Sequence, residues 1–207
     1  MNYNGRRIIG ITGGIGSGKT MILNILEEKY NALVIEADKI GHKLQEPNQT
    51  VYNDIVKAFG AEILEEPHIS GTSPIDRKKL GQIVFSDDDK LKCLNAITHP
   101  AIHKYIQKLI ENSTKHLIVI EAAILTETSL VTLTDELWYI YADMQVRLSR
   151  LQQYRGISHE KALQVMANQP DDKHFREKCS IVIDNSMTIE NTLQQIKEIL
   201  KDDSDKI

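Results

Sequence analysis

The chain has 207 residues, of which 41% are hydrophobic and 26% are charged, and its formal net charge is −4. This length and balance are typical of one globular domain with insertions, and they exclude collagen-like, low-complexity and wholly disordered chains. Because acidic residues outnumber basic ones, no overall positive charge attracts nucleic acid or anionic membranes, and we expect neither as a partner.

The lengths of the apolar runs and the number of cysteines indicate the cellular compartment in which we expect the protein. The apolar runs fall well short of the roughly 18 residues that a membrane span needs, and the first apolar stretch is too short for a secretory leader. The two cysteines, Cys93 and Cys179, lie far apart and form no C-x-x-C pair. We expect a cytoplasmic protein whose thiols are packed and unreactive, with a catalytic thiol as the alternative.

Short β-branched runs alternate with helical patterns along the chain. The expected strands are apolar on both faces and span residues 7–11, 32–35, 116–120, 137–142 and 181–183. The expected helices span residues 19–29, 50–59, 91–98, 100–112, 144–153, 158–168, 172–178 and 189–201, and Thr188 is the expected N-cap of the last. Pro100 suits the first position of a helix, which predicts a corner between two helices after His99. The alternation predicts an α/β fold with a doubly wound, five-stranded parallel sheet flanked by helices.

The clearest motif is GGIGSGKT at residues 13–20, which matches the phosphate-binding pattern G-x-x-x-x-G-K-[ST] in full. Its glycines let backbone N–H groups approach phosphate oxygens, and the next helix turns its positive end toward the same anion. Lys19 can reach the β- and γ-phosphates, and the Thr20 hydroxyl can bind Mg²⁺. The predicted nucleotide site consists of Gly14, Ile15, Gly16, Ser17, Gly18, Lys19 and Thr20. The chain has no Asn-Lys pair, hence no N-K-x-D guanine-reading motif, which favours ATP over GTP.

Acidic residues follow three of the expected strands. Glu36 and Asp38 follow the second strand, Glu121 the third and Asp143 the fourth. Ligands collect at the carboxyl ends of parallel strands, so each acid is a candidate for binding a metal or accepting a proton. Asp38 and Asp143 could instead cap the helices that follow them.

Four further blocks carry a family resemblance. They are VIEADKI at residues 34–40, IDRKKLGQIVF at 75–85, LNAITHPAI at 94–102 and VIDNS at 182–186. With the phosphate-binding loop they resemble the dephospho-CoA kinases from about residue 8 to residue 200. The resemblance implies a P-loop NTPase fold and a kinase of coenzyme A biosynthesis. Such a kinase would transfer the γ-phosphoryl group of ATP, with Mg²⁺, to the ribose 3′-hydroxyl of the small molecule dephospho-CoA.

The same resemblance implies roles for single residues. Asp38 lies beside the acceptor hydroxyl, and Arg77, His99 and Pro100 line the acceptor site. Arg150 leads the basic lid, and Asn185 lies at the adenine end of ATP. The alternatives are that Arg77 pairs with Asp76 or caps a helix, that His99 is a helix-corner residue, and that Arg150 is solvated at the surface.

The resemblance also divides the single kinase domain. The expected core is about residues 6–40, 115–145 and 179–207, with an acceptor-binding helical insertion at about 41–114 and a lid at about 146–178. Residues 145–178 carry seven Lys or Arg against four Asp or Glu, a local charge of +3. The chain departs from the family pattern at Glu36, Tyr154 (followed by Arg155), Val165, residues 123–126 and residues 179–180. Another small-molecule or nucleoside kinase, or a weakly catalytic nucleotide-binding protein, is the alternative function. The oligomeric state is not predicted.

Overall fold

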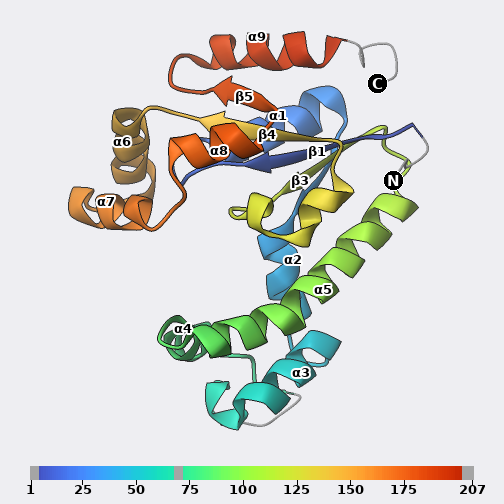
Figure 1. Cartoon of the computed structure of the whole chain (residues 1–207), viewed down its shortest axis with the longest axis vertical. Helices are drawn as coiled ribbons and strands as arrows, with labels where there is room; N and C mark the ends of the chain where they lie inside the picture. The colour runs from blue at the N-terminus through green and yellow to red at the C-terminus, as the bar shows by residue number, and fades with distance from the viewer. Residues whose placement is uncertain (1–4, 68–71, 202–207) are drawn as a thin grey trace. The chain divides into compact units, whose positions relative to one another are not determined.

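A computed structural model describes residues 5–67 and 72–201 of the chain (Figure 1). Packing of Cα atoms divides the described residues into two compact units. The first unit lies within residues 1–35 and 110–207, and the second lies within residues 36–109.

The first unit is built on a five-stranded sheet whose strands lie in the order β2-β3-β1-β4-β5. The strands are β1 (Arg7–Thr12), β2 (Leu33–Glu36), β3 (Leu117–Glu121), β4 (Glu136–Tyr141) and β5 (Ile181–Asp184). The pairs β1–β3, β1–β4 and β4–β5 are parallel. Each strand begins and ends within one residue of its predicted position. The predicted α/β fold with a five-stranded parallel sheet is confirmed.

Helices cover the two faces of this sheet, as the side chains of β4 show. The first unit contains α1 (Lys19–Tyr30), α6 (Met144–Arg155), α7 (His159–Ala167), α8 (Asp172–Lys178) and α9 (Ile189–Ile199). Of these, α1 and α9 pack on one face of the sheet and α8 packs on the other, whereas α6 and α7 pack against each other. Trp138 and Ile140 belong to the core that contains residues of α1 and α9. Tyr139 points to the opposite face, because strand side chains alternate, and stacks on Phe175 of α8 with ring centroids 4.7 Å apart. Thr188 caps α9 as predicted, accepting a hydrogen bond from the Asn191 N–H.

The second unit has its own hydrophobic core. It contains α2 (Ala37–Leu44), α3 (Thr50–Phe59), α4 (Arg77–Phe85) and most of α5 (Asp88–Asn112). Tyr52, Ile55, Ile63 and Leu64 are fully buried at its centre. Tyr52 also donates a hydrogen bond of 2.7 Å to the Ser73 carbonyl. Among the described residues, the side chains of this core all come from the second unit.

The helix α5 runs without interruption through Pro100, so the predicted corner after His99 is wrong. Proline lacks the N–H that would bond the carbonyl of Ala96. Both Pro100 and Ala96 are exposed, so water can reach this carbonyl. Leu94, Ile97 and Ala101 pack against the core of the second unit. Burial of these apolar side chains favours a continuous helix despite the lost hydrogen bond.

The two cysteines differ in environment. Cys179 is buried, and burial raises the pKa of its thiol to about 11. Cys93 is exposed on α5, so the prediction that both thiols are packed is wrong for this residue. In the described part of the chain, none of the helices has the length and apolar character needed to cross a membrane.

We expect 5,5′-dithiobis(2-nitrobenzoic acid) at pH 8 to label only Cys93 in the folded protein. The raised pKa of Cys179 keeps this buried thiol protonated, and the thiolate is the reactive form. Absorbance of the released thiol chromophore should report one thiol before unfolding and two after it. Equal labelling rates for both cysteines in the folded protein would contradict the buried position of Cys179.

Candidate functional site

The phosphate-binding loop connects β1 to α1 and depends on its glycines. Gly13, Gly16 and Gly18 have φ values of 150°, 81° and 95°, which favour glycine. A Cβ atom on Gly18 would lie 2.2 Å from Nδ2 of Asn185. A Cβ atom on Gly13 would lie 2.5 Å from the carbonyl oxygen of Ile140. The loop therefore has both the backbone conformation and the close packing that only glycine permits.

Lys19 and Thr20 begin α1 directly after the loop. The Lys19 Nζ donates a hydrogen bond of 2.7 Å to the Gly13 carbonyl and lies 3.8 Å from Oε1 of Glu121. Glu121 is the last residue of β3 and is 9% exposed. Thr20 is exposed in the first turn, where N–H groups lack intrahelical acceptors. Lys19, Thr20 and Glu121 therefore surround the N-terminal end of α1, which attracts anions.

Arg150 and Asn185, predicted from the family resemblance, both contact the loop at Ser17. Arg150 donates from Nη1 to the Ser17 carbonyl at 3.2 Å and from Nη2 to the Asn185 carbonyl at 2.9 Å. Asn185 is 2% exposed and donates from Nδ2 to the Ser17 carbonyl at 2.8 Å, while its Oδ1 accepts from the Thr192 hydroxyl at 2.9 Å. Because Arg150 is half-buried and bonded to two loops, the alternative of a solvated surface residue is wrong.

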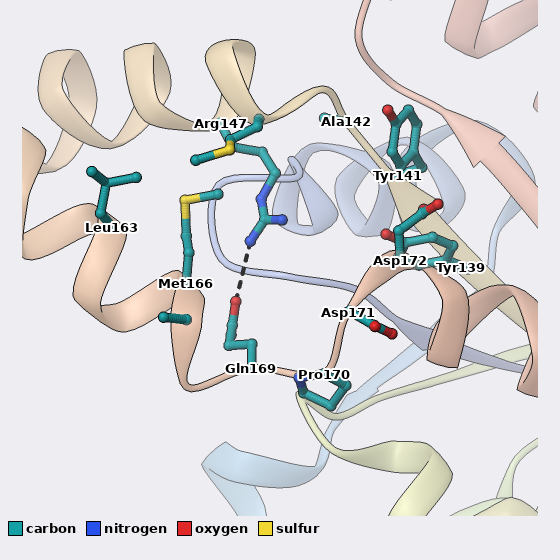
Figure 2. Close-up of a pocket in the computed structure, with 12 residues that line it drawn as sticks. Tyr139, Tyr141, Ala142, Arg147, Leu163, Met166, Gln169, Pro170, Asp171 and Asp172 are labelled. Carbon is teal, nitrogen blue, oxygen red and sulfur yellow. Dashed lines mark hydrogen bonds between the residues drawn. The ribbon is translucent and has the colours of Figure 1, made fainter.

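Two residues that the sequence analysis did not single out, Arg147 and Gln169, contact the loop at Ile15. Figure 2 shows the Arg147 side chain extending from α6 toward Gln169, which follows α7. They line a pocket of about 610 Å³ together with Tyr139, Tyr141, Ala142, Met144, Leu163, Met166, Ala167, Pro170, Asp171 and Asp172. Burial lowers the pKa of the Arg147 guanidinium. One sequence signal could have found Arg147. It precedes Arg150 by three residues in the same helix, and this spacing places both side chains on one face.

The acids at the strand ends have different environments. Glu36 forms an ion pair of 2.6 Å with Lys39. Asp143 is at the N-cap position of α6, but its side chain makes no capping hydrogen bond and accepts one of 2.6 Å from Tyr141. This hydrogen bond is the main cause of the raised pKa of Tyr141. The alternative that the Asp143 side chain caps α6 is therefore wrong.

The remaining predicted site residues belong to the second unit. Asp38 is exposed in the first turn of α2, but the N-cap residue is Glu36, so the capping alternative for Asp38 is wrong. Asp76 caps α4 by accepting from the N–H groups of Lys78 and Lys79. Arg77 is exposed in that first turn and forms no ion pair with Asp76 among the described residues.

His99 is half-buried and Pro100 exposed within α5, so His99 is not at a helix corner. The acceptor-binding roles of Asp38, Arg77, His99 and Pro100 stay predictions, as do the catalytic role of Arg150 and the adenine contact of Asn185.

We expect Gly18→Ala to weaken the affinity for ATP by about tenfold or more, because a Cβ atom would collide with Asn185 and strain the backbone. The control is Gly5→Ala, since Gly5 also has a positive φ of 77° but no atom within 4 Å of an added Cβ. Titration calorimetry with MgATP should show normal affinity for the control. Equal affinities for both variants would contradict the close contact between Gly18 and Asn185.

Comparison with known proteins places this site in a family. The dephospho-CoA kinase family model matches residues 7–191. A dephospho-CoA kinase of Carboxydothermus hydrogenoformans is 39% identical over 198 residues, covering 94% of this chain and 93% of that relative. The dephospho-CoA kinase structure from Campylobacter jejuni has a TM-score of 0.66 at 25% identity, covering 96% of this chain and 98% of that chain. A crystal structure of a Thermus thermophilus protein shares the fold with a TM-score of 0.80 at 24% identity, covering 95% and 97% of the two chains. The P-loop NTPase fold and the family resemblance are thus confirmed, and the chain belongs to the dephospho-CoA kinase family.

Proposed function

We propose that this protein transfers the γ-phosphoryl group of ATP to the ribose 3′-hydroxyl of dephospho-CoA, giving coenzyme A and ADP. The observation that carries the proposal is a complete phosphate-binding loop, with Lys19 and Arg150 bonded to its carbonyls, in a chain of this family. Phosphoryl transfer passes through a loose transition state whose negative charge is spread over oxygen atoms. Fixed cations and backbone N–H groups stabilise such charge without reorganising during the reaction.

The residues around Lys19 fit a magnesium ion that arrives with the triphosphate. Mg²⁺ in such sites takes one or two protein oxygens, and phosphates and water supply the others. Thr20 offers a hydroxyl in the first turn of α1, and Glu121 offers a carboxylate near Lys19. Thr20 and Glu121 are the residues that would hold the ion, and the bound ion would neutralise charge on the phosphates.

Asp38 is the proposed base for the acceptor. Its carboxylate is exposed and can accept a hydrogen bond from the ribose 3′-hydroxyl. A sugar hydroxyl is a poor nucleophile, so a carboxylate within hydrogen-bond reach orients the oxygen and takes its proton as the new bond to phosphorus forms. Arg77 is suited to the acceptor's diphosphate, since a guanidinium donates two parallel hydrogen bonds to phosphate oxygens. His99 and Pro100 complete the proposed acceptor wall.

The segment of α6, α7 and α8 is the proposed lid. Its +3 charge has the sign needed to cover phosphates, and closure would keep water from taking the phosphoryl group. Tyr154 and Arg155 are both exposed at the end of α6. Arg150 reaches the loop from the same helix and is the proposed lid cation.

A coupled ADP-release assay tests this function. We expect MgATP turnover to rise strongly with dephospho-CoA and to stay at background with coenzyme A, whose 3′-hydroxyl is already phosphorylated. The two compounds share every other group, so the difference isolates the acceptor oxygen. ADP release at the same rate with coenzyme A, or without either compound, would contradict the proposed acceptor.

We expect Asp38→Asn to lower kcat by about 100-fold or more, because the amide accepts no proton, while the KM for ATP changes little. Asp54→Asn is the matched control, since Asp54 is an exposed carboxylate on α3 of the same unit. Steady-state kinetics with both substrates varied will separate kcat from the two KM values. An unchanged kcat for Asp38→Asn would shift the base role to Glu121 or to no residue.

A further inference from the structure

Both polar groups of Ile15, its N–H and its carbonyl, are bound by side chains from outside the loop. The Ile15 N–H donates to Oε1 of Gln169 at 2.8 Å, and the Ile15 carbonyl accepts from Nε of Arg147 at 2.8 Å. Arg147 also donates from Nη2 to the same Gln169 oxygen at 3.2 Å. The Gln169 oxygen therefore accepts two hydrogen bonds, which fixes the orientation of its amide. We call these three residues the Ile15 clamp.

The residues of the Ile15 clamp are also closely packed against their neighbours. The Ile15 side chain packs against the apolar cluster of Leu148, Leu151 and Ala162, which joins α6 to α7. A Cβ atom on Gly14 would lie 2.3 Å from Nη2 of Arg147, and one on Gly16 would lie 2.9 Å from the Arg147 carbonyl oxygen. The tip of the loop is thus shaped to fit one arginine of α6.

Other polar groups of the pocket in Figure 2 have structural partners. Asp171 accepts from the His174 N–H at the start of α8, and the Tyr141 hydroxyl donates to Asp143. In contrast, Arg147 and Gln169 form hydrogen bonds with the phosphate-binding loop. Both are half-buried, and a hydrogen bond from a charged donor is stronger where water is partly excluded.

We infer that Arg147 and Gln169 are positioning residues for the nucleotide, acting through Ile15. By holding the Ile15 N–H and carbonyl in one orientation, they set the path of the loop and thus the direction of the N–H groups that follow. Loss of either side chain would let the loop adopt several conformations, and ATP would have to select the binding one. This inference rests on the proposed ATP site and adds that the lid helices control nucleotide affinity when no acceptor is present.

The test compares Arg147→Lys and Gln169→Leu with the controls Arg176→Lys and Gln153→Leu, which alter exposed residues of α8 and α6. Lysine keeps the charge but has no guanidinium to bond both Ile15 and Gln169. We expect each clamp variant to weaken MgADP affinity and raise the KM for ATP by about tenfold. The KM for dephospho-CoA should change less than about twofold, since the clamp touches only the nucleotide loop.

Two further measurements separate positioning from general destabilisation. The double variant should bind MgADP no more weakly than the weaker single variant, because both changes release the same residue. Amide exchange of Ile15 in the nucleotide-free protein should accelerate in Gln169→Leu and stay slow in Gln153→Leu. An unchanged MgADP affinity in both clamp variants, or additive losses in the double variant, would overturn the inference. The MgADP titration needs no acceptor, so it is read independently of whether dephospho-CoA is the substrate.

Discussion

The direction of three carbonyl groups determines what the phosphate-binding loop can do. The carbonyls of Gly13, Ile15 and Ser17 are each bound by side-chain donors of the protein: Lys19, Arg147, and the pair Arg150 and Asn185. Peptide groups whose carbonyls are held in this way have their N–H groups on the opposite side. Glycine supplies the backbone freedom for such a path, and cationic or amide side chains from other elements stabilise it. Anion binding by this loop is therefore a property of the surrounding fold as well as of its motif.

The two units divide the proposed work. The unit with the sheet contains the residues that would bind the phosphoryl donor, because the loop, Glu121, Arg150 and Asn185 all lie there. The helical unit contains the proposed acceptor residues, including Asp38, and has a core of its own. The dephospho-CoA kinase family model matches residues 7–191, which include both sets of residues.

The sequence predicts the elements whose signals are local, and it fails where long-range packing decides. The strands are found because each is a short β-branched run, and the loop because its glycines and Lys19 have fixed spacing. The continuity of α5 through Pro100 depends on burial of Leu94, Ile97 and Ala101, which no local rule contains. The helix α4 is not among the predicted helices, although Asp76 is a good N-cap. Arg147 and Gln169 belong to no motif, and they meet at Ile15 because α6 and α7 pack beside the loop.

The most direct test of this account follows the phosphoryl group itself. The protein is incubated with Mg²⁺, dephospho-CoA and ATP that carries a radioactive γ-phosphate. The products are then separated, and their masses are measured by mass spectrometry. We predict that the label appears in a product with the mass of coenzyme A, phosphorylated on the ribose 3′-oxygen. Label recovered as inorganic phosphate, with dephospho-CoA unchanged, would contradict it.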